Sequence, residues 1–183
     1  LYSAAMKLYE GWVFIPYILS ISILPVILKI KEKSIQDYEK SLTILVALVF
    51  WAGIVISLIM IFLGEWLIIV TFGPDYIEAK NVLQVLFFSA AFNSLGVVSA
   101  RYLIVEGMER KIIYRSALAL FINVSLNLVL IPSYGIQGAA IATFIAIFMA
   151  YYVINMIDKD LVQLRKICNN GVFFIKLTKT NIK

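Results

Sequence analysis

Four long stretches of the sequence carry no charged side chain: residues 11–28, 41–64, 81–100 and 116–157. A charge at the centre of a membrane helix costs about 2.5–3.5 kcal/mol, and a helix needs about 20 residues to cross a bilayer. The last stretch, 42 residues long, is sufficient for two helices, with a break at residues 132–135. The pattern predicts an all-α integral membrane protein with about five transmembrane helices.

The composition excludes several other classes of protein. Of the 183 residues, 62% are apolar and only 15% are charged, whereas soluble domains have about 45–50% and about 25%. The chain has no histidine and a single cysteine, Cys168, so a disulfide scaffold, a zinc or haem site and a histidine-dependent triad are all disfavoured. We expect no cofactor, no metal and no enzymatic activity.

The charge-free stretches also predict the domain organisation. The apolar stretch from Trp66 to Phe72 is too short to cross a bilayer, and Gly73 and Pro74 follow it. We therefore expect an interfacial segment over residues 65–79, anchored by Trp66 and Tyr76. Residues 1–157 should form a transmembrane bundle and residues 158–183 a basic tail. The expected spans are about 9–28, 41–63, 81–105, 112–131 and 136–157.

Basic residues predict the orientation of the bundle. The expected spans put 13 Lys and Arg on one side and 2 on the other, with Arg101 inside a span. The positive-inside rule makes the first side cytoplasmic, so the C-terminus is inside, and it accounts for the net charge of +5 without a nucleic-acid partner. The first group is Lys29, Lys31, Lys33, Lys40, Arg110, Lys111, Arg115, Lys159, Arg165, Lys166, Lys176, Lys179 and Lys183, and the second is Lys7 and Lys80.

An odd number of spans then puts the start of the chain outside the cell. The sequence begins with Leu1 rather than Met, and no basic leader with a cleavage site precedes the first span. We expect the chain to be a fragment of a longer protein.

Arg101 is the strongest candidate for a functional residue, because it is the charge that lies farthest from the end of an expected span. A guanidinium there suits phosphate, which it can bind through two parallel hydrogen bonds. The alternatives, of about equal weight, are that its long side chain reaches the headgroups or pairs with Glu106. Asn93, eight residues earlier, can share a broad face with Arg101.

Ser116, Asn123 and Asn127 form a narrow polar stripe on the next helix. Amides lose their hydrogen-bond partners in hydrocarbon, so the stripe must face protein or a wet cavity. Hydrogen bonding between helices is favoured over direct substrate contact for Asn123 and Asn127. Gly138 and Ala142, four residues apart, indicate close packing of two helices.

Three sequence blocks, taken in order, resemble the C-terminal part of a polysaccharide flippase. The blocks are Tyr2 to Ala5, Phe72 to Tyr76, and Asn123 to Thr143, of which the last is the most specific. This family belongs to the superfamily that also holds multidrug exporters and the lipid II flippase. The resemblance implies that the five helices form most of the second six-helix lobe of a twelve-helix transporter.

The resemblance also implies a function and partners. The substrate would be an undecaprenyl-diphosphate-linked oligosaccharide repeat unit for O-antigen or capsule, moved across the membrane by alternating access around a cationic cavity. Arg101, Asn93, Asn123 and Asn127 would contact it. The partners would be this lipid-linked substrate, membrane lipid and the missing N-terminal half of the same protein. The location would be a bacterial or archaeal plasma membrane, crossed several times.

Other functions remain open at the level of the sequence. A multidrug exporter of the same superfamily is one alternative, although the four charge-free stretches leave no Asp or Glu in the interior of a span for ion coupling. An integral membrane polysaccharide polymerase or glycosyltransferase is another, although the expected outer loops are short. A membrane scaffold without transport activity is a third, in which the asparagine stripe serves packing alone.

Overall fold

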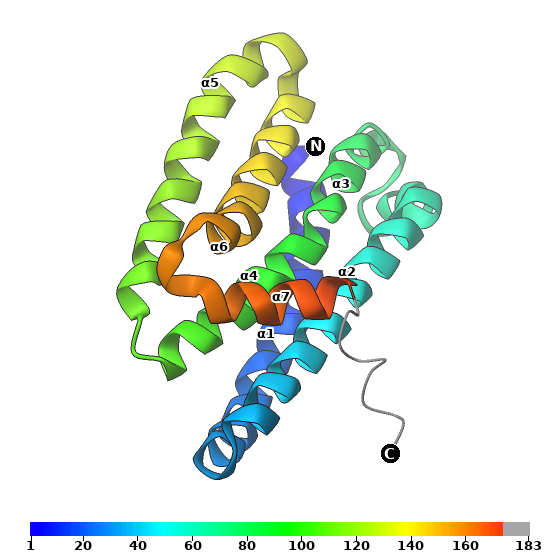
Figure 1. Cartoon of the computed structure of the whole chain (residues 1–183). Coiled ribbons are helices and arrows are strands. Elements are labelled where there is room, and N and C mark those ends of the chain that lie inside the picture. The colour runs from blue at the N-terminus through cyan, green and yellow to red at the C-terminus, as the bar shows by residue number, and fades with distance from the viewer. Residues whose placement is uncertain (174–183) are drawn as a thin grey trace.

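A computed structural model describes residues 1–173, and every regular element in this part of the chain is helical. The ten-residue end of the expected basic tail, residues 174–183, lies outside the described residues. Short 3-10 turns occur at Pro74–Tyr76 and Lys159–Leu161, and a π-helical turn at Met149–Val153. The helices are α1 (Tyr2–Lys33), α2 (Ile35–Phe72), α3 (Ala79–Phe88), α4 (Ala90–Val105), α5 (Glu109–Phe148), α6 (Ile154–Ile157) and α7 (Val162–Phe173) (Figure 1).

Helix α5 is a hairpin rather than one straight helix. Gly135 has φ 56° and ψ −137°, a conformation that breaks the helix. The two arms before and after Gly135 lie side by side, as shown by the hydrogen bond that the Asn123 side chain donates to Thr143 at 3.2 Å. A Cβ atom on Gly138 would collide with the backbone of Leu130. The chain therefore reverses within the segment from Pro132 to Gly135, and the absence of a side chain at Gly138 lets the two arms meet.

The chain runs back and forth as α1, α2, the pair α3 and α4, and the two arms of α5 (Figure 1). By length and apolar composition, three helical stretches of the described chain qualify as membrane spans: α1, α2 and the stretch Glu109–Ile157. The pair α3 and α4, bent by 42°, adds a fourth when it is counted as one span. The position of each helix relative to a bilayer stays a prediction.

Several helix boundaries differ from those expected. Helix α2 starts at Ile35, where the Ser34 hydroxyl accepts from the backbone N–H of Asp37 at 3.2 Å, and it runs without interruption to Phe72. The stretch from Trp66 to Phe72, expected as an interfacial segment outside the second span, is therefore part of the same helix. Gly73, with φ 93°, ends it. The third expected span is not one straight helix, because it bends at Ser89.

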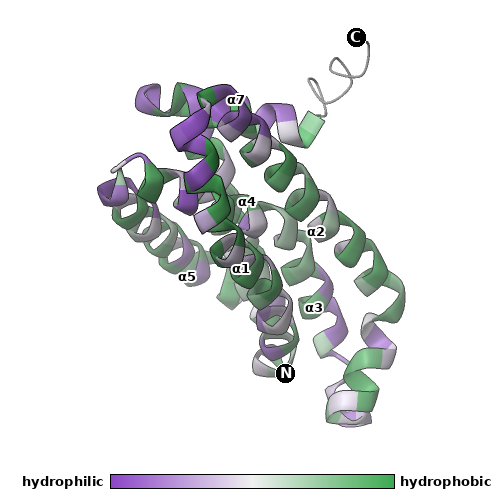
Figure 2. Ribbon diagram, turned by 90° about the horizontal axis from the view of Figure 1, so that it is seen from below, coloured by the Kyte–Doolittle hydropathy of each residue, from purple (hydrophilic) through white to green (hydrophobic). Residues whose placement is uncertain are grey.

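The expected basic tail begins as a helix packed on the bundle. Leu164, Ile167 and Cys168 of α7 are buried in the same core as the facing residues of α2 and α4. Gly171 lies so close to Val46 and Thr43 of α2 that a Cβ atom would be 2.6 Å from the Val46 side chain. Figure 2 shows hydrophobic residues along most of α2 and hydrophilic residues gathered on and around α7. The described part of the tail is thus an amphipathic helix laid across the bundle.

Ion pairs join the helices at the end of the bundle that holds the α1–α2 turn. The Nζ of Lys31 lies 2.8 Å from Oε1 of Glu106, which also accepts from the Tyr38 hydroxyl at 3.0 Å. The Nζ of Lys111 lies 2.6 Å from Asp158 and 2.9 Å from Asp160. The first cluster joins α1, α2 and α4, and the second closes the base of the α5 hairpin.

Asp158 predicts a loss of stability in acid. Burial alone would raise the pKa of its carboxyl, but hydrogen bonds from Lys111 and from the backbone N–H of Asp160 lower it below the ordinary value of 3.8. The stabilisation is therefore fully present above pH 3.8 and is lost as the pH falls through the lowered pKa. Thermal unfolding in detergent should show this loss in the wild type and a smaller one in Asp158→Asn. Identical acid profiles would contradict the prediction.

Candidate functional site

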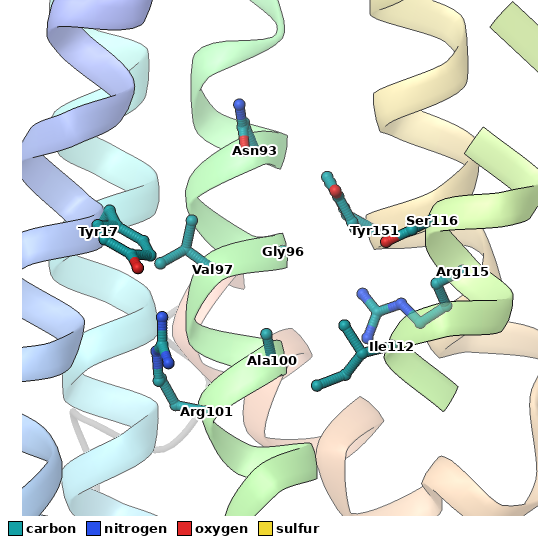
Figure 3. Close-up of a pocket in the computed structure, with 10 residues that line it drawn as sticks. All are labelled: Tyr17, Asn93, Gly96, Val97, Ala100, Arg101, Ile112, Arg115, Ser116 and Tyr151. Carbon is teal, nitrogen blue, oxygen red and sulfur yellow. The ribbon is translucent and has the colours of Figure 1, made fainter. Parts of the chain in front are cut away.

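A cavity of about 170 Å³ lies across one face of α4, between α1 and α5. Arg101 and Tyr17 stand on the α1 side of α4, and Arg115, Ser116 and Tyr151 stand on the side of the α5 hairpin (Figure 3). We call this the arginine cavity. Its lining residues are Tyr17, Asn93, Gly96, Val97, Ala100, Arg101, Ile112, Arg115, Ser116 and Tyr151.

Arg115 is the most unusual residue of the arginine cavity, because only 5% of it is exposed. Its Nε donates to the carbonyl oxygen of Ala150 at 3.1 Å, within the π-helical turn, and its guanidinium carbon lies 5.4 Å from the centre of the Tyr151 ring. Its Nη2 is buried and has no hydrogen-bond partner. A buried guanidinium nitrogen without a partner is costly, so the arrangement calls for an acceptor that the described chain does not supply.

Gly96 makes room for this arrangement. A Cβ atom at this position of α4 would lie 2.5 Å from the ring of Tyr151. The missing side chain lets the tyrosine lie directly against α4, and its ring then faces the Arg115 guanidinium. The contact between α4 and the second arm of the hairpin therefore positions the Tyr151 ring against the Arg115 guanidinium.

Arg101 faces α1. Its Nε donates to the Ser20 hydroxyl at 3.3 Å, and its guanidinium carbon lies 5.3 Å from the centre of the Tyr17 ring. The alternative in which Arg101 pairs with Glu106 is wrong, because Glu106 accepts from Lys31 and Tyr38 instead. The side chain is therefore held between α4 and α1, at the edge of the cavity.

The two positive charges have no acidic counterpart. Within residues 1–173, the ion pairs involve Lys31, Lys80 and Lys111, and neither arginine takes part in one. The same residues contain no group of His, Cys, Asp and Glu arranged to hold a metal ion. Two guanidinium groups beside the amide of Asn93 and the hydroxyl of Ser116 offer hydrogen-bond donors to an anion with several oxygen atoms, such as a phosphate.

A second cavity, of about 280 Å³, adjoins the first, since Tyr17 and Asn93 line both. The amide Nδ2 of Asn93 donates to the Tyr9 hydroxyl at 3.0 Å, which leaves its Oδ1 as an acceptor. We call this the Glu10 cavity, after its one charged lining residue. The lining residues are Met6, Tyr9, Glu10, Val13, Phe14, Tyr17, Asn93, Thr143 and Ile147.

The four site residues expected from the sequence separate into two pairs. Arg101 and Asn93 line the arginine cavity together. Asn127 instead donates to Asn123 at 3.0 Å, and Asn123 donates to Thr143 at 3.2 Å, so this pair joins the two arms of the hairpin. Hydrogen bonding between helices, the favoured interpretation, accounts for these two asparagines, and their contact with a substrate stays a prediction.

Sequence reasoning missed Arg115 as a site residue. It directly precedes the longest charge-free stretch, so the charge pattern groups it with the basic end of the bundle. The structure begins α5 at Glu109, which places Arg115 almost two turns inside the helix. Its neighbour Ser116 already belongs to the polar stripe, and that proximity is the signal in the sequence that points to the cavity.

Comparisons with known proteins give two distant relatives. The chain is 31% identical over 123 residues to an uncharacterized membrane protein of Methanocaldococcus jannaschii, covering 63% of this chain and 24% of the relative. It is 29% identical over 126 residues to a capsular polysaccharide biosynthesis protein, CapF, of Staphylococcus aureus, covering 67% of this chain and 32% of the relative. The chain thus spans less than a third of the length of either.

Neither a family model nor a solved structure matches the chain. The described residues nevertheless combine apolar helices of membrane-spanning length with similarity to a protein named as a membrane protein. The chain is therefore a membrane protein, helical throughout residues 1–173 in its regular elements, and distantly similar to a protein of capsular polysaccharide biosynthesis.

Proposed function

We propose that the chain forms part of a membrane carrier that moves undecaprenyl-diphosphate-linked oligosaccharide repeat units across the plasma membrane. It does so by alternating access and without covalent chemistry. The chain supplies most of one lobe, and the remainder of the transporter supplies the other. The product would serve the synthesis of a surface polysaccharide.

The arginine cavity is the observation that carries this proposal. Arg101 and Arg115 lie in helices of an apolar bundle, and in the described chain neither pairs with a carboxylate. Charged groups inside membrane helices are rare because they are costly, and those present line pathways or bind ligands. The partnerless Nη2 of Arg115 supports an anionic ligand in particular.

A diphosphate headgroup fits the charge and the chemistry of this cavity. A sugar diphosphate cannot cross hydrocarbon alone, since each polar group without a partner costs several kcal/mol. Guanidinium, amide and hydroxyl donors replace the hydrogen bonds that water provides. Similarity to a capsular polysaccharide biosynthesis protein supports a lipid-linked saccharide as the source of the phosphate.

The experiment that tests the proposal uses Arg101→Ala in the complete gene product, expressed in a strain from which the gene has been deleted. We expect surface polysaccharide to fall about tenfold or more, because a hydrogen bond to a charged group contributes about 1.5–3 kcal/mol. Lipid-linked repeat units should accumulate on the cytoplasmic face. Surface polysaccharide is measured with an antibody, and the membrane abundance of the protein by immunoblot.

Arg110→Ala is the matched control, because Arg110 is an exposed arginine at the start of α5, outside both cavities. It should leave the polysaccharide unchanged. Normal polysaccharide in Arg101→Ala, at equal membrane abundance, would contradict the proposal. Normal polysaccharide together with a lost resistance to toxic compounds would indicate a drug exporter instead.

A further inference from the structure

The Glu10 cavity has a chemical character that an anion site does not explain. It adjoins the arginine cavity through Tyr17 and Asn93, but neither Lys nor Arg lines it. Its one charged lining residue is the carboxylate of Glu10, which makes no ion pair or hydrogen bond within the described chain. A phosphate would be repelled from this end.

Three residues of α1 form a continuous stripe along the Glu10 cavity. Glu10, Phe14 and Tyr17 follow the spacing i, i+4 and i+7, which puts them on one face of the helix. The rings of Phe14 and Tyr17 stack, with their centres 6.4 Å apart and their planes at 25°. Phe14 is 60% exposed and Tyr17 is 44% exposed, so both rings are available to a ligand.

The Glu10 carboxylate, on the same face as the two rings, requires polar surroundings, so this face is unsuited to a purely hydrocarbon ligand. A sugar ring suits it better. Its axial C–H groups pack on the electron-rich face of an aromatic ring, and its hydroxyls donate to carboxylate and amide oxygens. The Phe14 and Tyr17 rings supply the first contact, and Glu10 and the Oδ1 of Asn93 supply the second.

We propose that the Glu10 cavity is a subsite for an uncharged sugar ring, next to the phosphate site of the arginine cavity. The inference rests on the proposed function and specifies the orientation in which the substrate binds across the two cavities. The diphosphate lies at Arg101 and Arg115, and the sugar that follows it lies along α1 on the stacked rings of Phe14 and Tyr17. Tyr17 contacts both parts, since its ring also faces Arg101.

The test measures lipid binding by the complete gene product in detergent, by native mass spectrometry. The probes are undecaprenyl diphosphate alone and the same lipid carrying glucose, galactose, N-acetylglucosamine or N-acetylgalactosamine. We expect the wild type to bind one or more of the sugar-bearing lipids more tightly than the bare lipid. Phe14→Ala should weaken binding of that lipid roughly 2- to 10-fold and leave the bare lipid unaffected.

Two control variants separate the aromatic face from general effects on the fold. Phe14→Tyr keeps a ring in place and should retain the preference for the sugar-bearing lipid. Phe62→Ala removes an aromatic side chain of α2 that is 81% exposed and outside both cavities, and it should change neither affinity.

A failure of the sugar subsite is distinguishable from a failure of the proposed function. Equal affinity of the wild type for the bare lipid and all four sugar-bearing lipids would overturn the sugar subsite and leave the diphosphate site standing. Equal weakening of all five lipids by Phe14→Ala would overturn the sugar subsite in the same way. Failure of the wild type to bind even undecaprenyl diphosphate would instead contradict the proposed function.

Discussion

Arg115→Met should lower transport at least tenfold without lowering the thermal stability of the protein. Methionine fills much of the same volume but removes the buried charge, whose Nη2 has no partner in the described chain. Loss of a hydrogen bond to a charged ligand costs about 1.5–3 kcal/mol, which is a decrease in affinity of roughly 10- to 150-fold. Removal of an uncompensated buried charge is often neutral or stabilising.

The measurements are flipping of lipid-linked oligosaccharide in proteoliposomes and the Tm in detergent. A merely structural arginine would give the opposite pattern, with a lower Tm and normal transport in the molecules that remain folded. Arg115→Lys is an informative second variant, because it keeps the charge without the forked donors. We expect it to recover part of the activity, and full activity in Arg115→Met would exclude Arg115 from the substrate site.

Gly53→Ala should destabilise the bundle more than Gly64→Ala, the other glycine-to-alanine change in α2. A Cβ atom at Gly53 would lie 2.6 Å from the Cα of Ala91 and 2.7 Å from its backbone nitrogen, so backbone rather than a flexible side chain would have to move. Overpacking of this kind costs about 1–3 kcal/mol. The Tm should fall by roughly 2–10 °C.

Gly11→Ala is the matched control, since a Cβ atom on Gly11 of α1 would meet nothing within 4 Å. In a helix, alanine is favoured over glycine by about 1 kcal/mol, so this variant should hold or raise the Tm. Equal decreases for both variants would mean that the close approach of α2 and α4 at Gly53 contributes nothing.

The helices are predictable from the sequence because the absence of charge over about 20 residues leaves few other structures. The break between Pro132 and Gly135 is equally readable, and the chain reverses there. The end of α2 is not, because the charge of Glu65 suggests that the span stops before it. In the structure Glu65 pairs with Lys80 at 2.7 Å, and α2 continues for about two further turns to Phe72, so this charge does not end the helix.

Of the residues that line the arginine cavity, those on α4 are predictable from the sequence and Arg115 is not. Arg101 and Asn93 share a cavity because they lie on one helix, where spacing determines the face. Arg115 comes from another helix, and its position depends on the hairpin, on Gly96 and on the carbonyl of Ala150. Contacts between distant segments of this kind follow from tertiary packing, which no local pattern in the sequence encodes.

The π-helical turn at Met149–Val153 sets which face of the following helix, α6, is buried. Buried positions recur every four residues at Ala142, Ala146 and Ala150, and the next one, Asn155, comes five residues later. Without the one additional residue that the π-helical turn inserts, the buried face of α6 would be rotated by about 100° about the helix axis. Asn155, which donates to Ser99 at 3.2 Å, would then point elsewhere. The π-helical turn, whose Ala150 carbonyl accepts from Arg115, thus also keeps the buried face of α6 turned toward α4.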